Sequence, residues 1–180
     1  MIVLLIYSTI SYRLYLIFMN ITLNFKKQIA SKSYANSILF VDEKFNISGL
    51  KKYLSNSEYS YISDLIKTKD IKKKIVTFDI SSKKKIILVS LKKNLKSFDA
   101  ENLGAKCYDI FKEIKITGCT VNSDTIPKGL KNITGYFLHG IKLKSYKFEK
   151  YKTTKNKGNI SIDVVVKTFQ IIKIKLSLVQ

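Results

Sequence analysis

The stretch Gly135–Thr153 reads GYFLHGIKLKSYKFEKYKT and changes character halfway along. Its first half continues a helical spacing of apolar residues that begins upstream, and the buried face is predicted to be Leu130, Ile133, Phe137 and Ile141. Pro127 suits the first turn of this helix, because that turn needs no backbone N–H donor. The second half interleaves aromatic and basic residues, namely Tyr146, Phe148 and Tyr151 with Lys144, Lys147, Lys150 and Lys152. The stretch therefore predicts a core-facing helix followed by an aromatic and basic tail.

A second helix is predicted upstream, from Leu103 to Lys115, with the sequence LGAKCYDIFKEIK. Ser97 or Asp99 can cap its N-terminus, and Glu101 lies in its first turn. Its apolar positions recur with helical spacing and are Leu103, Cys107, Ile110, Phe111 and Ile114. Because they share one face, we expect this helix to pack against a sheet.

Strands and helices alternate over the rest of the chain. Alternating or β-branched apolar runs predict strands at 21–25, 37–41, 75–80, 86–91, 119–121 and 159–166. Between the second and third strands a helix is predicted, with Tyr59, Ile62 and Ile66 on one face. The polar run Ser81–Lys85 predicts a hairpin between the third and fourth strands. The order β-β-α-β-β-α-β-α-β predicts an α/β fold in three layers, a mixed sheet with helices on both faces.

Three features together resemble the N-terminal domain of the leucyl (cytosol) aminopeptidase family. They are the helix Leu103–Lys115, the turn-rich link through Asn122, Ser123, Asp124 and Pro127, and the closing pattern S-Y-x-F-x-x-Y-K from Ser145 to Lys152. The resemblance extends over about Ile21–Lys167 and is strongest between Leu103 and Lys152. It implies a three-layer α/β fold similar to that of macro domains.

The resemblance also implies a function, because in this family the N-terminal domain is not the catalytic one. The intact enzymes remove N-terminal residues from peptides with two divalent ions, zinc or manganese, which activate a bridging water. The ligands, a Lys and several Asp and Glu residues, lie in a separate C-terminal domain that contains an Asn-Thr-Asp-Ala-Glu-Gly-Arg motif. We therefore expect this chain to be a non-catalytic fragment, inactive alone, whose partners are that catalytic domain and the other subunits of a hexamer.

No catalytic, cofactor-binding or metal-binding residue is predicted in these 180 residues. The nearest match to the metal-binding motif is Asn122-Ser123-Asp124-Thr125, which lacks the Ala-Glu-Gly-Arg continuation. Asn and Asp in such a position commonly bond their own backbone, so the segment is interpreted as a turn before Pro127.

Residues of reactive type are interpreted as structural. His139 has no acidic residue three or four positions away to orient it, which favours a surface or packing role. The two cysteines, Cys107 and Cys119, form no recognisable pattern and indicate a reduced, cytoplasmic protein, with Cys107 as core filling rather than a nucleophile. The glycines of the two helices form no phosphate-binding loop and suit a close approach between a helix and its neighbour; they are Gly104, Gly135 and Gly140.

Two further patterns have a functional and a structural interpretation each. Asp109 and Glu113 are an i, i+4 pair of acids, but flanking lysines favour a solvated ion-pair face over a metal site. The aromatic and basic tail has the composition of a single-stranded nucleic-acid site. The alternative, which the aminopeptidase resemblance favours, is that Tyr146 and Phe148 pack beneath the sheet while the lysines stay solvated.

The chain carries 33 basic and 13 acidic residues, a formal net charge of +20. This charge indicates the alternative function, a small basic binding protein for nucleic acid or a membrane surface, with salt-sensitive affinity. Arg13 is the only arginine, however, and lysine cannot form arginine's bidentate contacts to bases and phosphates. We therefore expect no specific nucleic-acid partner.

Three segments are predicted: an apolar leader at 1–18, the domain at 19–167 and an atypical tail at 168–180. The leader lacks the charged start and the cleavage site of a signal peptide. A membrane span would bury Arg13 at a cost of about 2.5–3.5 kcal/mol if central, whereas the resemblance favours translation from Met19. The tail alternates like an edge strand where the family has a linker helix, which favours a disrupted reading frame over a new strand.

Overall fold

The computed structural model describes residues 21–26, 35–68, 73–130, 132–146 and 159–166. The predicted leader and the predicted tail at 168–180 lie outside these ranges, as does the aromatic and basic segment from residue 147 to 158. Within the described ranges, helices and strands follow one another in the order predicted from the sequence.

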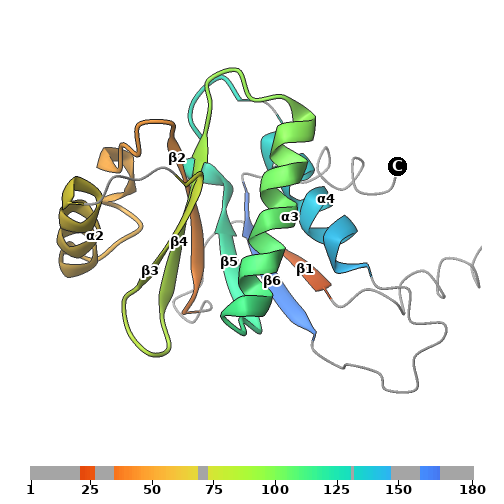
Figure 1. Cartoon of the computed structure of the whole chain (residues 1–180), viewed down its shortest axis with the longest axis horizontal. Coiled ribbons are helices and arrows are strands. Elements are labelled where there is room, and N and C mark those ends of the chain that lie inside the picture. Colours follow the sequence, from red (N-terminus) through yellow and green to blue (C-terminus); the bar gives the residue numbers. More distant parts are fainter. Residues whose placement is uncertain (1–20, 27–34, 69–72, 131, 147–158, 167–180) are drawn as a thin grey trace, which may run out of the picture.

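A mixed sheet forms the middle of the fold (Figure 1). Its described strands are β1 (Ile21–Lys26), β2 (Ser37–Asp42), β3 (Ile75–Asp79), β4 (Lys85–Leu91), β5 (Gly118–Asn122) and β6 (Ile160–Val165). Their spatial order is β1-β6-β5-β2-β4-β3. All neighbouring pairs are parallel except β3 and β4, which form the predicted hairpin. A hairpin needs only a tight turn, whereas parallel pairs need longer crossover connections.

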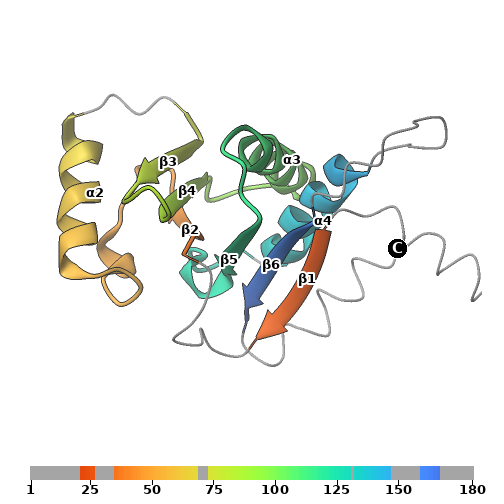
Figure 2. The same cartoon turned by 90° about the horizontal axis from the view of Figure 1, so that it is seen from below.

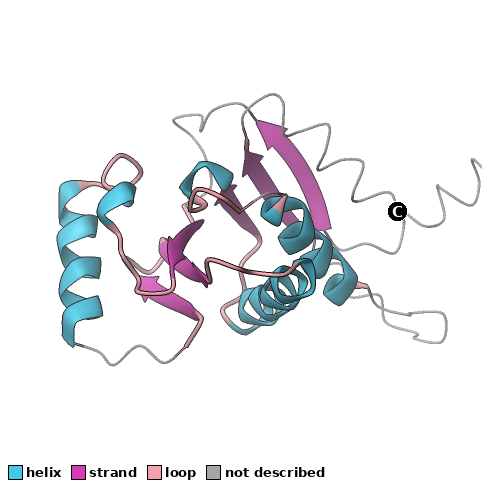
Figure 3. Cartoon of the chain, turned by 90° about the horizontal axis from the view of Figure 1, so that it is seen from above, coloured by secondary structure: helices cyan, strands magenta, loops and turns pink. Residues whose placement is uncertain are grey.

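Helices lie on both faces of this sheet. They are α2 (Asn56–Thr68), α3 (Ser97–Glu113) and α4 (Ile133–Ser145). Figure 2 shows α3 and α4 together on one side of the strands, with α2 apart from them. Figure 3, seen from the opposite direction, shows the same separation. The predicted three-layer α/β fold is confirmed.

The alternation of side chains along β2 explains why helices cover two faces. Ile38 and Phe40 belong to the hydrophobic core that α3 and α4 share, whereas Leu39 and Val41 belong to the core beneath α2. None of the four is more than 2% exposed. A strand that is apolar on both faces is typical of the centre of a parallel sheet.

Most of the predicted core residues are buried. Leu103, Phe111, Ile133 and Phe137 lie in the core under α3 and α4, and Ile62 of α2 is 0% exposed in the other core. The remaining predicted residues of the larger core are partly exposed and pack on its edge; they are Ile110, Ile114 and Leu130.

The sheet face that α2 covers turns polar toward β1. The strand register places Thr120, Asn122, Asp163 and Asn24 on this face, beyond the apolar part. Asp163 is 3% exposed; it pairs with the ammonium group of Lys26 and accepts a 3.2 Å hydrogen bond from Asn24 Nδ2. A buried carboxylate needs such partners, because an unpaired charge in the interior costs several kcal/mol.

α3 and α4 touch each other backbone to backbone at two glycines. A Cβ atom placed on Gly104 would lie 2.0 Å from the carbonyl oxygen of Phe137. One placed on Gly140 would lie 1.9 Å from the carbonyl oxygen of Glu101. Since Cβ atoms essentially never come within 3.0 Å of another heavy atom, any side chain here would push the helices apart. The close approach predicted for Gly104 and Gly140 is confirmed.

The third helix begins later than predicted. Its first residue is Ile133, and Pro127 lies in the preceding loop. Gly129 and Asn132 have left-handed backbone, with φ of 94° and 58°. A right-handed helix cannot continue through such residues, so α4 cannot begin at Pro127.

The predicted cap of α3 is also wrong. Lys96 occupies the N-cap position, and no side chain bonds to the helix there. Ser97 is already the first helical residue, which leaves its hydroxyl past the position where a cap acts. Asp99 lies in the first turn, where its charge still suits the helix dipole.

Substitution of Gly104 or Gly140 by Ala should destabilise the chain by about 1–3 kcal/mol, because the added methyl group meets backbone atoms that cannot rotate away. Gly49→Ala is the matched control, since nothing lies within 4 Å of a Cβ atom there, and its effect should stay within about 0.5 kcal/mol. Urea unfolding followed by circular dichroism measures all three. Equal stabilities for the Gly104→Ala, Gly140→Ala and Gly49→Ala chains would contradict the helix contact.

Candidate functional site

A pocket lies at the point where the chain connections leave two neighbouring strands in opposite directions along the sheet. β5 and β2 are neighbours, but the connection after β5 leads through α4 to β6, while that after β2 leads through α2 to β3 and β4. Open α/β sheets bind ligands at the carboxyl ends of the strands at such a point. The pocket has a volume of 350 Å³. This switch-point pocket is lined by Ser123, Asp124, Ile126, Pro127, Lys128, Gly129, Leu130, Asn132, Ile133 and Thr134.

A short 3₁₀ turn, Ser123–Thr125, fixes one wall of the switch-point pocket to the sheet. Asn122 Oδ1 accepts a 3.1 Å hydrogen bond from the backbone N–H of Asp124, as the predicted Asn turn requires. Thr125 Oγ1 donates to the carbonyl of Asn122 (2.7 Å) and accepts from the N–H of Phe40 in β2 (2.8 Å). The hydroxyl of Ser123 donates to the carbonyl of Val165 at the end of β6. The turn is thus tied to three neighbouring strands.

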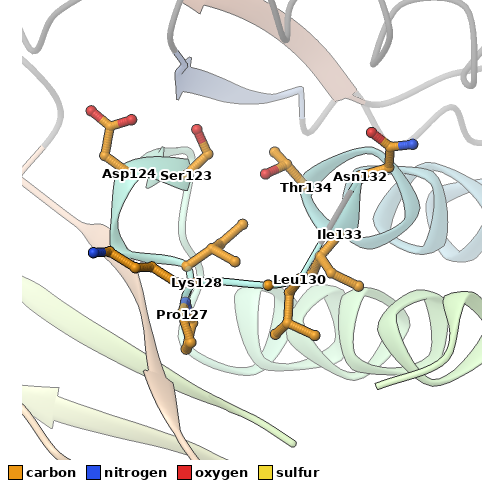
Figure 4. A pocket seen from close by; sticks show the side chains of 10 residues that line it. Ser123, Asp124, Pro127, Lys128, Leu130, Asn132, Ile133 and Thr134 are labelled. Atoms are coloured by element: carbon orange, nitrogen blue, oxygen red, sulfur yellow. The ribbon is translucent and has the colours of Figure 1, made fainter. Parts of the chain in front are cut away.

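The opposite wall of the pocket is the start of α4. Figure 4 shows Asn132 and Thr134 across the pocket from Ser123 and Asp124, with Lys128 on the loop between the walls. Asp124 and Lys128 are the charged residues among the described residues that line it. The lining contains no histidine or cysteine, and the Ser123 hydroxyl is engaged with a backbone carbonyl. The pocket therefore has groups that bind a polar molecule but no activated nucleophile or paired general base.

One wall of the pocket is formed by the segment Asn122–Thr125, which was interpreted from the sequence as a plain turn. The turn itself is confirmed, but the hollow beside it was missed because Pro127 was assigned to the first turn of a helix. A signal for the loop was present in Gly129 and Asn132, since both residue types tolerate left-handed backbone.

His139 has an acidic partner that the sequence did not reveal. Its Nδ1 lies 2.9 Å from Glu101 Oε1, so the pair joins α4 to α3 beside the glycine contact. The prediction that no acid orients this histidine is wrong, because the partner comes from the other helix. Its structural role is supported, since the two side chains link two packed helices and reach no pocket residue.

The acids on α3 are not assembled into a metal site. Asp109 lies 3.4 Å from Lys144 of α4, a partner on the neighbouring helix rather than one of the flanking lysines. Glu113 is exposed on the last turn of α3. In the part of the chain that the structure describes, no three His, Cys, Asp or Glu residues come together as a metal site requires.

The start of the aromatic and basic tail differs from its prediction. Tyr146 is 45% exposed and does not pack beneath the sheet. α4 ends one residue earlier, at Ser145, whose buried hydroxyl donates to the carbonyl of Lys142 (2.7 Å). Phe148 and Tyr151, the other aromatic residues of that prediction, lie outside the described residues.

Comparisons with known proteins give structural matches only. No family model matches the chain, and no curated protein matches it either. A mutant of tomato leucine aminopeptidase is similar with a TM-score of 0.65 and 16% identity over 88% of this chain and 34% of that one. The macrodomain of Thermus aquaticus DarG is similar with a TM-score of 0.54 and 10% identity over 81% of this chain and 99% of that one. The chain thus has the fold shared by these proteins and spans about a third of the aminopeptidase's length.

Within the described ranges, no helix is both long and apolar enough to cross a bilayer. The predicted apolar leader at 1–18 lies outside these ranges.

Cys107 and Cys119 should be unreactive in the folded chain. Both are 0% exposed, and burial raises the pKa of each thiol well above its ordinary value, so neither forms thiolate at neutral pH. Iodoacetamide should modify both at least about 100-fold more slowly in buffer than in denaturant. The thiol of a Ser60→Cys variant, on the exposed side of α2, provides the comparison. If Cys107 in the folded chain were labelled as fast as that thiol, it would not be inert core filling, and the interpretation as a nucleophile would be favoured.

Proposed function

We propose that this chain is the N-terminal, non-catalytic domain of a leucyl aminopeptidase. The observation that supports this most is the similarity to the tomato enzyme, which covers 88% of this chain but 34% of that protein. Three sequence features resemble the same family; they are the helix Leu103–Lys115, the Asn122 turn and the S-Y-x-F-x-x-Y-K pattern. The macrodomain similarity has a lower TM-score and supports the fold rather than this function.

In this proposal the chain has a polypeptide partner. The partner is a catalytic domain of the same family, which holds the two divalent ions, zinc or manganese, and the assembled protein is a hexamer in the cytoplasm. The present chain contributes a rigid three-layer unit. The acids of the described residues suit that role, because they are dispersed and do not form the carboxylate cluster that a two-metal hydrolase needs.

A second candidate is a small basic protein that binds nucleic acid or a membrane surface. The net charge of +20 favours it. Lysines alone support salt-sensitive, non-specific binding, and a steep loss of affinity with rising salt would accompany it. The aminopeptidase proposal explains more, because it also accounts for the fold and for the quoted sequence patterns.

The gene region downstream of the codon for Gln180 tests the proposal most directly. Translated in all three forward frames, it should encode a metal-ligand segment with the Asn-Thr-Asp-Ala-Glu-Gly-Arg motif, in frame or shifted. An unrelated gene at that place, with no such motif, would contradict the proposal.

The purified chain should not hydrolyse leucine anilides with zinc, manganese or magnesium. Metal-assisted hydrolysis needs clustered carboxylates and a positioned water, and Asp109, the nearest approach to a ligand, is paired with Lys144. Release of the aniline is measured with and without a chelator. Turnover that requires metal, and that falls in Asp109→Asn but not in the exposed control Asp64→Asn, would show that the chain is an enzyme.

A further inference from the structure

A small basic hollow lies at the carboxyl ends of β2 and β4, on the other side of β2 from the switch-point pocket. Its volume is 140 Å³. The residues that line it come from the loop after β2, the segment before β3 and the end of β4, and they are Glu43, Phe45, Lys73, Lys74, Ser90, Lys92 and Leu95. We call it the lysine hollow.

The charges around the lysine hollow are not balanced. Among the described residues that line it there are three ammonium groups and one carboxylate, an excess of two positive charges. Among the residues that the structure describes, Lys73, Lys74 and Lys92 form no ion pair, whereas other lysines do so elsewhere on the surface. Like charges gathered around a small space repel one another, and an anion of charge −2 would neutralise them.

The wall of the lysine hollow is held in place before any ligand arrives. Asp42 Oδ1 accepts hydrogen bonds from the backbone N–H groups of Lys44 (3.0 Å) and Asn46 (2.9 Å), which closes the loop after β2. Ser90 Oγ donates to the carbonyl of Asp42 (3.2 Å), which joins that loop to β4. The carboxylate of Asp42 is thus occupied by the loop, and the loop is a rigid part of the sheet edge.

Phe45 is the most unusual residue of this loop. Its φ is 55°, although it is a bulky residue, and its side chain is 8% exposed. Left-handed backbone is strained at such a residue, and it persists only where the surroundings enforce it. Here it lets the chain turn sharply after β2 so that Phe45 and Leu95 supply an apolar wall beside the lysines.

We propose that the lysine hollow binds a phosphate group in its dianionic form, as a phosphomonoester or inorganic phosphate. The excess of two positive charges fits a dianion, and the hollow is too small for much more than the phosphoryl group itself. Lysine suits this task as a point charge, without the bidentate geometry that base reading requires. The inference is independent of the aminopeptidase proposal, because it uses none of the residues on which that proposal rests.

Titration of the ¹⁵N-labelled full chain with inorganic phosphate tests the inference, with sodium chloride holding ionic strength constant. The amide signals of Phe45, Ser90 and Lys92 should move together and saturate, with a dissociation constant on the order of 1 mM. Shifts that stay linear in phosphate, or that spread evenly over the lysine-rich surface, would overturn it.

Two triple variants of equal net charge separate the lysine hollow from the overall charge. K73Q/K74Q/K92Q should weaken phosphate binding at least about tenfold, while K67Q/K83Q/K106Q, on exposed positions elsewhere, should weaken it less than about twofold. Thermal unfolding confirms that both remain folded. Equal weakening in the two variants would overturn the site.

Glu43→Gln gives a test that a folding defect cannot imitate, because the expected change is a gain. Glu43 has the one carboxylate among the described residues that line the lysine hollow, and its removal should tighten phosphate binding roughly threefold. Unchanged or weaker binding would contradict the charge argument.

The dianionic phosphate group can belong to a soluble metabolite or to a lipid headgroup. Glycerol phosphate in solution and phosphatidic acid in vesicles present it in the two forms. Saturable binding of the first that depends on Lys73, Lys74 and Lys92 supports a soluble ligand. Preferential sedimentation with the vesicles, lost in the same triple variant, supports a headgroup.

Dimethyl phosphate, a monoanion, should bind more weakly, and equal binding would overturn the preference for a dianion.

Discussion

The backbone contact between α3 and α4 at Gly104 and Gly140 is the constraint on which the rest of the fold depends. Two helices that meet with their backbones can share one narrow strip of sheet, and both bury their apolar faces in a single core there. The edge-on contact of the Phe40 and Phe137 rings, with centroids 5.2 Å apart, carries this contact down to β2. The His139–Glu101 pair links the same two helices nearer the surface.

The position of α4 in turn sets the geometry of the sheet edge. Since the helix is held against α3, its first residue must lie where the loop from β5 can reach it, and the left-handed Gly129 and Asn132 take up the change of direction. The switch-point pocket is the space that this detour leaves. The loop after β2 also turns sharply, at the left-handed residue Phe45, and the lysine hollow lies beside this turn. Both hollows therefore arise from the same cause, sharp exits from parallel strands at one edge.

Periodicity predicted the parts of this fold that depend on neighbours along the chain. The apolar spacing of Leu103, Cys107 and Phe111 indicated α3 and its buried face, and alternation indicated the strands. Apolar spacing alone did not predict the start of α4, because Pro127 and Leu130 fit a helix locally. The left-handed backbone of Gly129 and Asn132 and the hydrogen bond between Thr125 and β2 show that the chain is a loop there. His139 and Tyr146 were misjudged for a related reason. Whether these side chains form a hydrogen bond or pack in the core depends on which residues the other helix or the sheet places next to them.

The uneven polarity of the face under α2 bears on how far this unit can act alone. Beneath α2 the sheet is apolar, but toward β1 it presents the Asp163–Lys26 pair, and Thr120 Oγ1 and Asn122 Nδ2 are buried without hydrogen-bond partners among the described residues. A buried polar group without a hydrogen-bond partner costs about 1–3 kcal/mol, so these two groups reduce the stability that this part of the sheet contributes. Selection for stability alone would favour Val or Ile at these positions, as on β2. Polypeptide that covers this polar half-face and offers hydrogen-bond partners to Thr120 Oγ1 and Asn122 Nδ2 would therefore raise the stability of the described sheet.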